Sequence, residues 1–196
     1  MSQTKTIELL HQEISFRKAT VNDVNILIDI IGDYYQKLNL SESAMQKGQA
    51  PWIWMSDQNV SFTVMLIGTT ISGFFVARHI KLNSHLHTFF VSDNFRGRGL
   101  GKTLLIRHWK EALSNARPPL TLTLHTHKVN QVTAGFYTKF GYKKLEQTES
   151  LPLEANGFGA WANNCRLKDR WPLKVGIELY GIRANQIKKY LEPSRF

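Results

Sequence analysis

The sequence predicts a single domain that mixes α-helices and β-strands. Its 196 residues fit the usual size of one domain, and 42% of them are hydrophobic, which is enough apolar material for one packed core. Segments with strand-like alternation and segments with helical spacing follow one another, and a glycine-rich run joins a strand to a helix. The expected domain covers residues 1–196, without repeats or linkers.

The first half of the chain predicts a strand, a helix and a hairpin. Residues 14–19 alternate apolar and polar side chains, as a half-buried strand does. Residues 20–23 have the pattern of a helix cap with an acidic third position, and the apolar spacing that follows predicts a helix to about Gln36. Residues 60–67 and 71–80 are rich in β-branched and aromatic side chains around a short turn, which predicts a hairpin.

The second half continues the alternation of strands and helices. Residues 150–173 are loop-like and unusually aromatic. The expected elements are a strand at 84–92, a helix from Gly99 to the stop at Pro118, a strand at 120–126, a short helix capped by Asn130 and ended by Gly141, a strand beginning at Tyr142, a strand at 175–182 and a helix at 184–192.

Charge and composition limit the partners and the compartment. Lys and Arg number 25 against 15 Asp and Glu, a net charge of +10 that favours a polyanionic partner such as nucleic acid, a membrane surface or a phosphorylated small molecule. No segment has the length and apolarity of a membrane span, and the first residues lack a signal-like apolar region. Cys165, the one cysteine, has no internal partner for a disulfide. We therefore expect a soluble, cytoplasmic protein.

The glycine-rich run RGRGLGKT at 96–103 predicts a phosphate site. A nucleoside triphosphate loop would need glycine at Arg96, and a dinucleotide fingerprint beginning at Gly97 would need glycine at Lys102, so both patterns fail by one residue. The start of a helix still exposes N–H groups and the positive end of the helix dipole to an anion. Gly97, Gly99 and Gly101 would let a phosphate approach the backbone closely. Positive charge around the phosphate would come from Arg96, Arg98 and Lys102.

The spacing Arg96-x-x-Gly99-x-Gly101 resembles the acyl-CoA loop of the GNAT superfamily of N-acetyltransferases, Gln/Arg-x-x-Gly-x-Gly/Ala. The segment NQVTAGFYTKFGY at 130–142 is similar to the family's Asn-x-x-Ala-x-x-Phe-Tyr-x-Lys-x-Gly-Phe helix, and 89–95 to its preceding strand and loop. The motifs cover about residues 84–145. The resemblance implies a mixed, mostly antiparallel central sheet with splayed parallel middle strands and helices on both faces.

The resemblance implies an acyl-CoA-dependent N-acyltransferase, with acetyl-CoA as donor and without a metal. The acceptor would be a primary amine of a small molecule or peptide, attacking directly in a ternary complex. Asn130 would contact the pantetheine region and Tyr137 would lie beside the thioester sulfur. The residues that the resemblance assigns to the donor are Phe89, Phe90, Val91, Arg96, Gly97, Arg98, Gly99, Leu100, Gly101, Lys102, Asn130, Phe136 and Tyr137.

Acyl transfer to an amine needs a proton donor for the leaving thiolate and a proton acceptor for the amine. The resemblance makes Tyr137 the general acid. His85 and His87 share one face of a strand by alternation and titrate near neutrality, and the string HLHTFFV resembles the strand of serotonin-type arylalkylamine N-acetyltransferases in which such a pair is the base. We rank His87 first, because it lies nearer the thioester. A metal site at His125 and His127 is not expected, since no Cys or carboxylate accompanies them.

The amine acceptor is less well defined by the sequence. By the resemblance it would be held by Tyr34, Tyr35, Trp52, Trp54 and Trp161 or Trp171, although these aromatic side chains also suit a core. The segment 150–173 is longer than the family's final hairpin turn and would shape the choice of acceptor. Two alternatives stay open. The first is acetylation of aminoacyl-tRNA, as in some GNAT toxins, and it is the one case in which nucleic acid is expected. The second is a non-catalytic acyl-CoA sensor. A homodimer is also left open.

Overall fold

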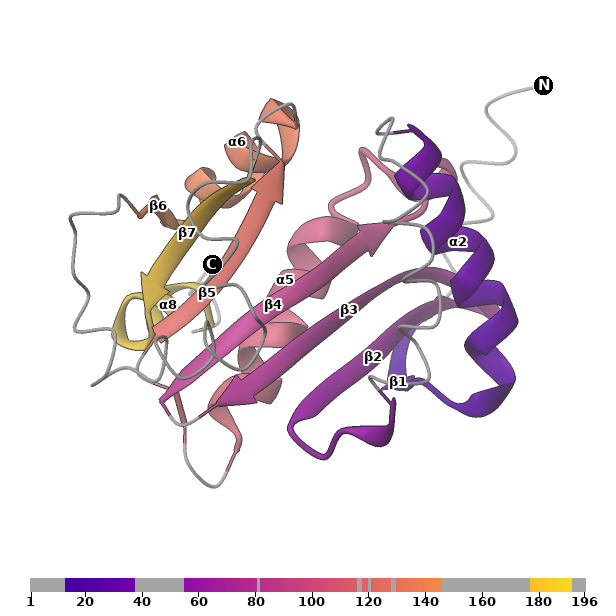
Figure 1. Cartoon of the computed structure of the whole chain (residues 1–196), viewed down its shortest axis with the longest axis horizontal. Coiled ribbons are helices and arrows are strands. Elements are labelled where there is room, and N and C mark those ends of the chain that lie inside the picture. Colours follow the sequence, from indigo (N-terminus) through magenta and orange to yellow (C-terminus); the bar gives the residue numbers. More distant parts are fainter. Residues whose placement is uncertain are drawn as a thin grey trace.

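The computed structural model describes residues 13–37, 55–80, 82–115, 118–119, 121–127, 130–145 and 177–191. Its strands form one seven-stranded sheet in the order β1-β2-β3-β4-β5-β7-β6 (Figure 1). They are β1 (Ile14–Lys18), β2 (Val60–Ile67), β3 (Thr70–Ile80), β4 (Asn83–Val91), β5 (Thr121–His127), β6 (Lys143–Lys144) and β7 (Ile177–Arg183). The helices are η1 (Val21–Asp23), α2 (Val24–Lys37), η3 (Asp93–Phe95), α5 (Leu100–Leu113), α6 (Gln131–Lys139) and α8 (Ala184–Leu191).

The sheet has one parallel pair among antiparallel neighbours. β4 and β5 run parallel, and α5 forms the crossover between them. All other neighbouring strands are antiparallel, including the β2–β3 hairpin. This arrangement confirms the predicted mixed, mostly antiparallel sheet with a parallel pair in its middle.

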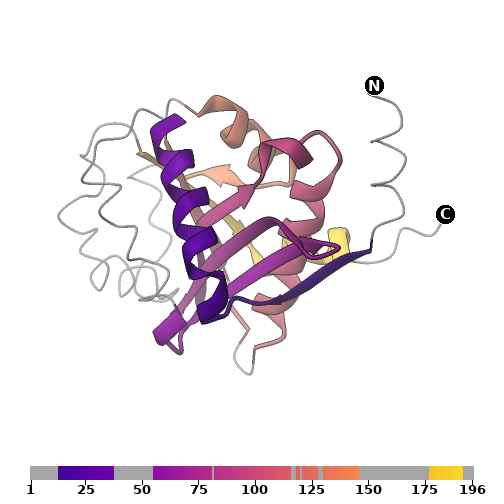
Figure 2. The same ribbon diagram turned by 90° about the vertical axis from the view of Figure 1, so that its right-hand side faces the viewer.

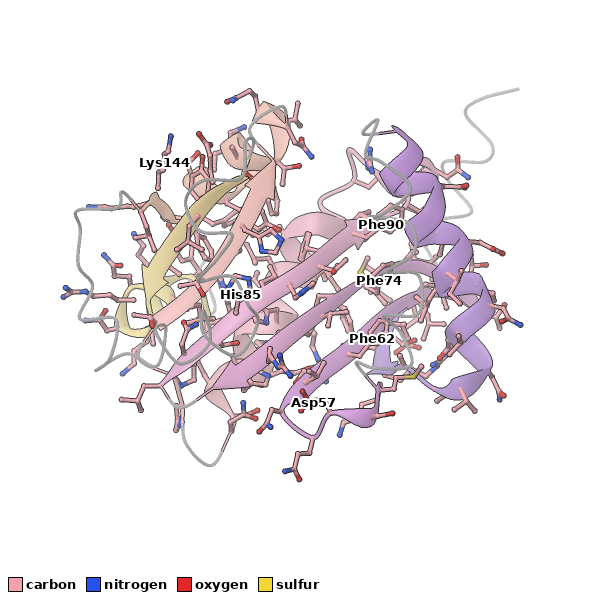
Figure 3. All side chains as sticks on the ribbon, viewed as in Figure 1. Asp57, Phe62, Phe74, His85, Phe90 and Lys144 are labelled. Carbon is pink, nitrogen blue, oxygen red and sulfur yellow. The ribbon has the colours of Figure 1, made fainter. Side chains whose placement is uncertain are left out.

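Helices cover both faces of the sheet, and the two core clusters lie beneath them. α2 lies on one side of the sheet and α5 on the other, as the view turned by 90° shows (Figure 2). On the α5 face, Leu104 and Trp109 are fully buried in the larger cluster. On the α2 face, Phe62, Phe74 and Phe90 form a row across β2, β3 and β4 (Figure 3), with Phe74 and Phe90 stacked at 5.5 Å between ring centroids. None of the described helices is both long and apolar enough to cross a lipid bilayer.

Local hydrogen bonds explain where η1, which leads into α2, and α6 begin. The Asp23 carboxylate accepts the backbone N–H of Thr20 at 2.7 Å and two bonds from the Arg17 guanidinium at 2.7 and 2.8 Å. The bonds from Arg17, ahead of that from Thr20, lower the pKa of Asp23 to about 2. At α6, the Asn130 side chain accepts the Thr133 N–H at 3.2 Å. Both caps that the sequence predicted are therefore present.

α5 ends before the stop that the sequence predicted, and the strand predicted to begin at Tyr142 is the short β6. α5 ends at Leu113, because Ser114 closes it: its hydroxyl donates to the Glu111 carbonyl at 3.0 Å. The expected stop at Pro118 is thus preceded by a local one. β6 has only two residues, which pair with β7 at Gly181 and Tyr180.

His108 of α5 makes the fold sensitive to acid. Its ring is fully buried 5.2 Å from that of Phe75, and neither ring nitrogen has a hydrogen-bond partner among the described residues. Burial, with a smaller repulsion from His79, lowers the pKa of His108 to about 3. The unfolded chain therefore binds more protons than the folded chain between this value and its ordinary pKa of about 6.5. The free energy of unfolding should therefore decrease as the pH is lowered through that window, by up to about 1.4 kcal/mol per pH unit from this residue.

The His108→Leu variant tests this effect, because it keeps an apolar contact with Phe75 and removes the titrating group. Urea unfolding at pH 7, 5.5 and 4.5 should show a shallower loss of stability in the variant than in the wild type. At pH 7 the variant should be more stable by about 1–3 kcal/mol, since an unsatisfied polar group has left the core. Parallel pH dependences would contradict this role for His108.

Candidate active site

The two parallel strands of the sheet separate part-way along their length. β4 and β5 pair only from Asn83–Thr121 to Leu86–Leu124. In the pairing with β3, Ala77 faces Leu86 and Val76 faces Thr88, so His87 is an extra residue in β4. Such a bulge bends a strand and increases its twist. The starts of β4 and β5 therefore lie side by side while their carboxyl ends lie apart (Figure 1).

The separation affects β4 from His87 onward. From His87 to Val91 the described pairing of β4 is with β3 alone. Backbone N–H groups on the side towards β5 can then bond an inserted ligand. This part of β4 contains Phe89, Phe90 and Val91, which the sequence resemblance assigns to the donor.

The loop that follows β4 leads into α5 and leaves backbone N–H groups without partners in the helix. The first bond of the helix runs from the Thr103 N–H to the Gly99 carbonyl at 3.2 Å, so the N–H groups before Thr103 have no carbonyl of the helix to bind. Gly97 and Gly99 have φ of 75° and 78°. A Cβ added at either would meet nothing within 4 Å, so the loop surface is open at both positions. The surface at Gly101 is not open, because a Cβ added there would lie 3.3 Å from the ring of Phe136.

The three cations of the loop have different environments. The Arg96 Nε donates to the Val91 carbonyl at 3.0 Å, and its guanidinium pairs with Asp93 at 2.9 Å. Arg96 therefore ties the loop back to the end of β4. Arg98 and Lys102 are exposed and make no ion pair within the described part of the chain. Their role in neutralising a bound anion stays a prediction.

An aromatic wall joins α6 to β4 beside the opening. Tyr137 is only 3% exposed, and its ring lies 5.9 Å from that of Phe89 and 5.2 Å from that of Phe136. The Phe89 and Phe136 rings are 6.0 Å apart. Leu100, at the start of α5, is buried in the same cluster. The structure thus brings together four of the residues that the sequence assigned to the donor.

The two predicted histidines differ in exposure. His85 is fully buried, with Nδ1 2.9 Å from Thr123 Oγ1 and Nε2 3.0 Å from Nδ1 of His125. Burial, and then repulsion from His125 and His87, holds the pKa of His85 well below 6.5. His87 is exposed, and its ring lies 6.5 Å from that of His85. Figure 3 shows where His85 lies on β4, beyond the row of phenylalanines.

Several predicted residues lie outside what the structure describes. Trp52, Trp54, Trp161 and Trp171 fall outside the described residues, as does the segment 150–173. Tyr34 and Tyr35 belong to α2, but their side chains are not described, nor is that of His127. Among the described residues, no group of three or more His, Cys, Asp or Glu side chains is arranged to bind a metal ion.

Comparison with known families identifies this arrangement. The sequence profile described as "Acetyltransferase (GNAT) domain" matches residues 35–158, more than half of the chain. The chain belongs to the GNAT acetyltransferase family. Transfer of an acetyl group from an acyl-CoA is the activity of this GNAT domain, and the parted strands and glycine loop are its candidate active site. A search of curated protein sequences finds no match.

Solved structures support the same fold for this GNAT chain. The PaiA N-acetyltransferase of Thermoplasma acidophilum, in complex with coenzyme A, is 17% identical with a TM-score of 0.62, over 87% of this chain and 99% of that one. A GNAT-family acetyltransferase of Staphylococcus aureus is 13% identical with a TM-score of 0.64, over 88% and 99%. A chimera of the Vibrio cholerae spermidine N-acetyltransferase SpeG and hSSAT is 10% identical with a TM-score of 0.61, over 90% and 98%.

Proposed function

We propose that the protein transfers the acetyl group of acetyl-CoA to a primary amine of a small molecule or peptide, by direct attack in a ternary complex. The observation that carries this proposal is the separation of β4 from β5 next to an open glycine loop at the start of α5. A thioester inserted between the strands would meet the edge of β4 that faces β5, while the phosphates of the donor would meet the loop. Acetyl-CoA supplies an activated acyl group.

The residues of the loop suit the diphosphate of CoA. The open surface over Gly97 and Gly99 allows phosphate oxygens to approach the backbone N–H groups, and the helix dipole favours their charge. Arg98 and Lys102 would pair with the phosphates, while Arg96 keeps the loop in place through Val91 and Asp93. Asn130 would contact the pantetheine region, beside the wall of Phe89, Phe136 and Tyr137.

Residues of this chain would supply both proton transfers. Most primary amines have a pKa near 10 and arrive as ammonium ions, so they must lose a proton before they attack. The exposure of His87 supports it as the acceptor of this proton, ahead of the fully buried His85. Tyr137 would donate a proton to the departing thiolate sulfur. The amine would be held by Tyr34, Tyr35, Trp52, Trp54 and Trp161.

Release of free thiol tests the proposal directly. The protein is incubated with acetyl-CoA and a panel of polyamines, arylalkylamines, aminoglycosides and lysine peptides, and thiol release above hydrolysis is followed. The proposal requires turnover with at least one of them and an acetylated amine in the mass spectrum. CoA binding without turnover would instead indicate an acyl-CoA sensor. Turnover confined to aminoacyl-tRNA, weakened by salt, would indicate the RNA-directed activity.

A further inference from the structure

A ladder of side-chain hydrogen bonds crosses the parallel pair of strands. The paired residues of β4 and β5 run from Asn83–Thr121 to Leu86–Leu124. The larger core cluster, on the α5 face, takes Leu86, Leu122 and Leu124 from these strands, so the alternate side chains lie on the opposite face of the sheet. The alternate side chains are polar, and they are Asn83 and His85 on β4 and Thr121, Thr123 and His125 on β5.

Each bond of the ladder joins one strand to the other. The hydroxyl of Thr121 donates to Asn83 Oδ1 at 3.2 Å, and Asn83 Nδ2 donates to Thr123 Oγ1 at 3.1 Å. Thr123 Oγ1 also lies 2.9 Å from His85 Nδ1, and His85 Nε2 lies 3.0 Å from His125 Nδ1. Either tautomer of His85 keeps its bond to Thr123, because a hydroxyl can donate or accept. The bonds therefore pass back and forth between β5 and β4 along the whole paired segment.

The ladder is buried, and it ends where the strands part. Asn83, His85 and Thr123 are at most 1% exposed, and Thr121 is 5% exposed. The last residue of the ladder, His125, is the first residue of β5 beyond the pairing with β4. Loss of one partner in such a place would leave a buried polar atom unsatisfied, so the bonds resist being broken. The ladder thus holds the two strands against each other up to the start of the opening.

We propose that this ladder, with Thr123 at its centre, is a positioning device for acetyl transfer, because it sets where β4 and β5 separate and fixes the width of the opening at its closed end. This inference rests on the proposed insertion of the thioester between the strands. It assigns a role in the reaction to Asn83 and Thr123, for which the sequence predicted none. Thr123 is a positioning residue, since it acts through the arrangement of the strands and not on the reacting atoms.

The width of the opening matters because the donor is held at two separate places. The diphosphate would bind at the start of α5, whereas the thioester would lie between the strands, so the loop alone does not direct the reacting carbonyl. A misplacement of about 1 Å can cost on the order of 100-fold in rate. The bulge at His87 bends β4 directly after its last pair with β5, and the ladder holds the strands together beside that bend. Loss of the ladder should therefore lower kcat and spare the affinity for CoA.

Two variants of Thr123 remove and keep the centre of the ladder. Thr123→Val retains the shape of the side chain but lacks the hydroxyl that Asn83 and His85 share, whereas Thr123→Ser retains the hydroxyl. The matched control is Thr63→Val on β2, which β3 separates from β4. Thr63 is 2% exposed, and the control removes its hydrogen bonds to the Glu111 carboxylate at 2.9 and 3.1 Å. Both valine variants thus lose one buried hydroxyl.

We expect Thr123→Val to lower kcat with an accepted amine by at least about tenfold, while its dissociation constant for CoA stays within about twofold of the wild type. Thr123→Ser should keep kcat within about threefold of the wild type, because it can make the same bonds. Thr63→Val should keep both quantities, although it loses stability in urea as Thr123→Val does. Steady-state thiol release and calorimetry with CoA supply these values.

Amide hydrogen exchange, followed by NMR without ligand, gives a readout that does not depend on turnover. The amides of residues 83–86 and 121–125 should exchange at least about tenfold faster in Thr123→Val than in Thr63→Val, because local opening of the paired segment adds to global unfolding. Thr123→Ser should show the protection of the wild type in the same residues. Equal exchange in the two valine variants would show that the ladder does not hold the strands, and it would overturn the inference.

The outcomes distinguish this inference from the proposed function. A wild type that acetylates no amine overturns the proposed function, and the role of the ladder in the reaction falls with it. Turnover in the wild type with equal kcat in Thr123→Val and Thr63→Val overturns the inference alone. If Thr123→Val does not fold, Thr121→Val takes its place, since it removes the first bond of the ladder. Values of kcat and of exchange equal to those of Thr63→Val would then overturn the inference.

Discussion

The Tyr137→Phe variant is expected to lose about 100-fold in kcat while its affinity for CoA stays within about twofold of the wild type. Only the hydroxyl is removed, and the ring keeps its contacts with Phe89 and Phe136. The loss should fall on kcat, because the proton reaches the leaving sulfur only in the transition state. Steady-state thiol release and calorimetry with CoA measure the two quantities.

Tyr142→Phe is the matched control for this effect. Tyr142 is buried beside Tyr137 at 5.6 Å between ring centroids, and its hydroxyl accepts the Trp109 Nε1–H at 3.0 Å. Its removal leaves that donor unpaired and should destabilise the fold by about 1–3 kcal/mol without a change in kcat. Equal kcat in Tyr137→Phe and the wild type would exclude Tyr137 as the general acid.

The Gly99→Ala variant is expected to weaken CoA binding by at least about tenfold. The φ of 78° at Gly99 lies in the left-handed region, in which an alanine is disfavoured by roughly 1–2 kcal/mol. No atom lies within 4 Å of the added methyl, so the fold tolerates it, but the methyl occupies the surface that a phosphate must approach. Calorimetry with CoA gives the affinity, and thermal unfolding gives the stability.

Gly32→Ala controls for a change of glycine itself. Gly32 lies within α2 and also has nothing within 4 Å of an added Cβ, but it does not have a positive φ. Alanine should stabilise this helix by about 0.5–1 kcal/mol and leave CoA affinity unchanged. Equal affinities for CoA in Gly99→Ala and Gly32→Ala would show that the backbone at Gly99 has no part in binding.

The fold could be predicted because its strongest signals are local. Alternation defined the strands, and the caps at Thr20 and Asn130 defined where two helices begin. The glycine loop was predicted for the same reason, since Gly97 and Gly99 adopt the positive φ for which glycine is selected. The resemblance to one family added the parallel pair, which no local pattern specifies.

The histidine network could not be predicted, because it depends on tertiary packing. The alternation of residues 120–126 places Leu122 and Leu124 on one face of β5 and Thr121, Thr123 and His125 on the other. The face with the polar residues is also covered in the structure: Thr123 is 1% exposed and bonds to Asn83 and His85, which are far away in the sequence. The bulge at His87 could not be predicted either, because no glycine or proline lies there. The burial of His108 could have been predicted, because it lies four residues after Leu104 on the apolar face of α5.

The central claim, that the start of α5 binds the diphosphate of CoA, is tested most directly by calorimetric titration of CoA into a charge-reversed loop. The variant Arg98→Glu with Lys102→Glu leaves Arg96 and its contacts intact. Its control, Lys188→Glu with Lys189→Glu on α8, changes the net charge equally at exposed positions elsewhere. We predict binding by the wild type and the control, and about 100-fold weaker binding by the loop variant, from two lost charged contacts. Equal affinities in all three proteins, or no binding by the wild type, would contradict the claim.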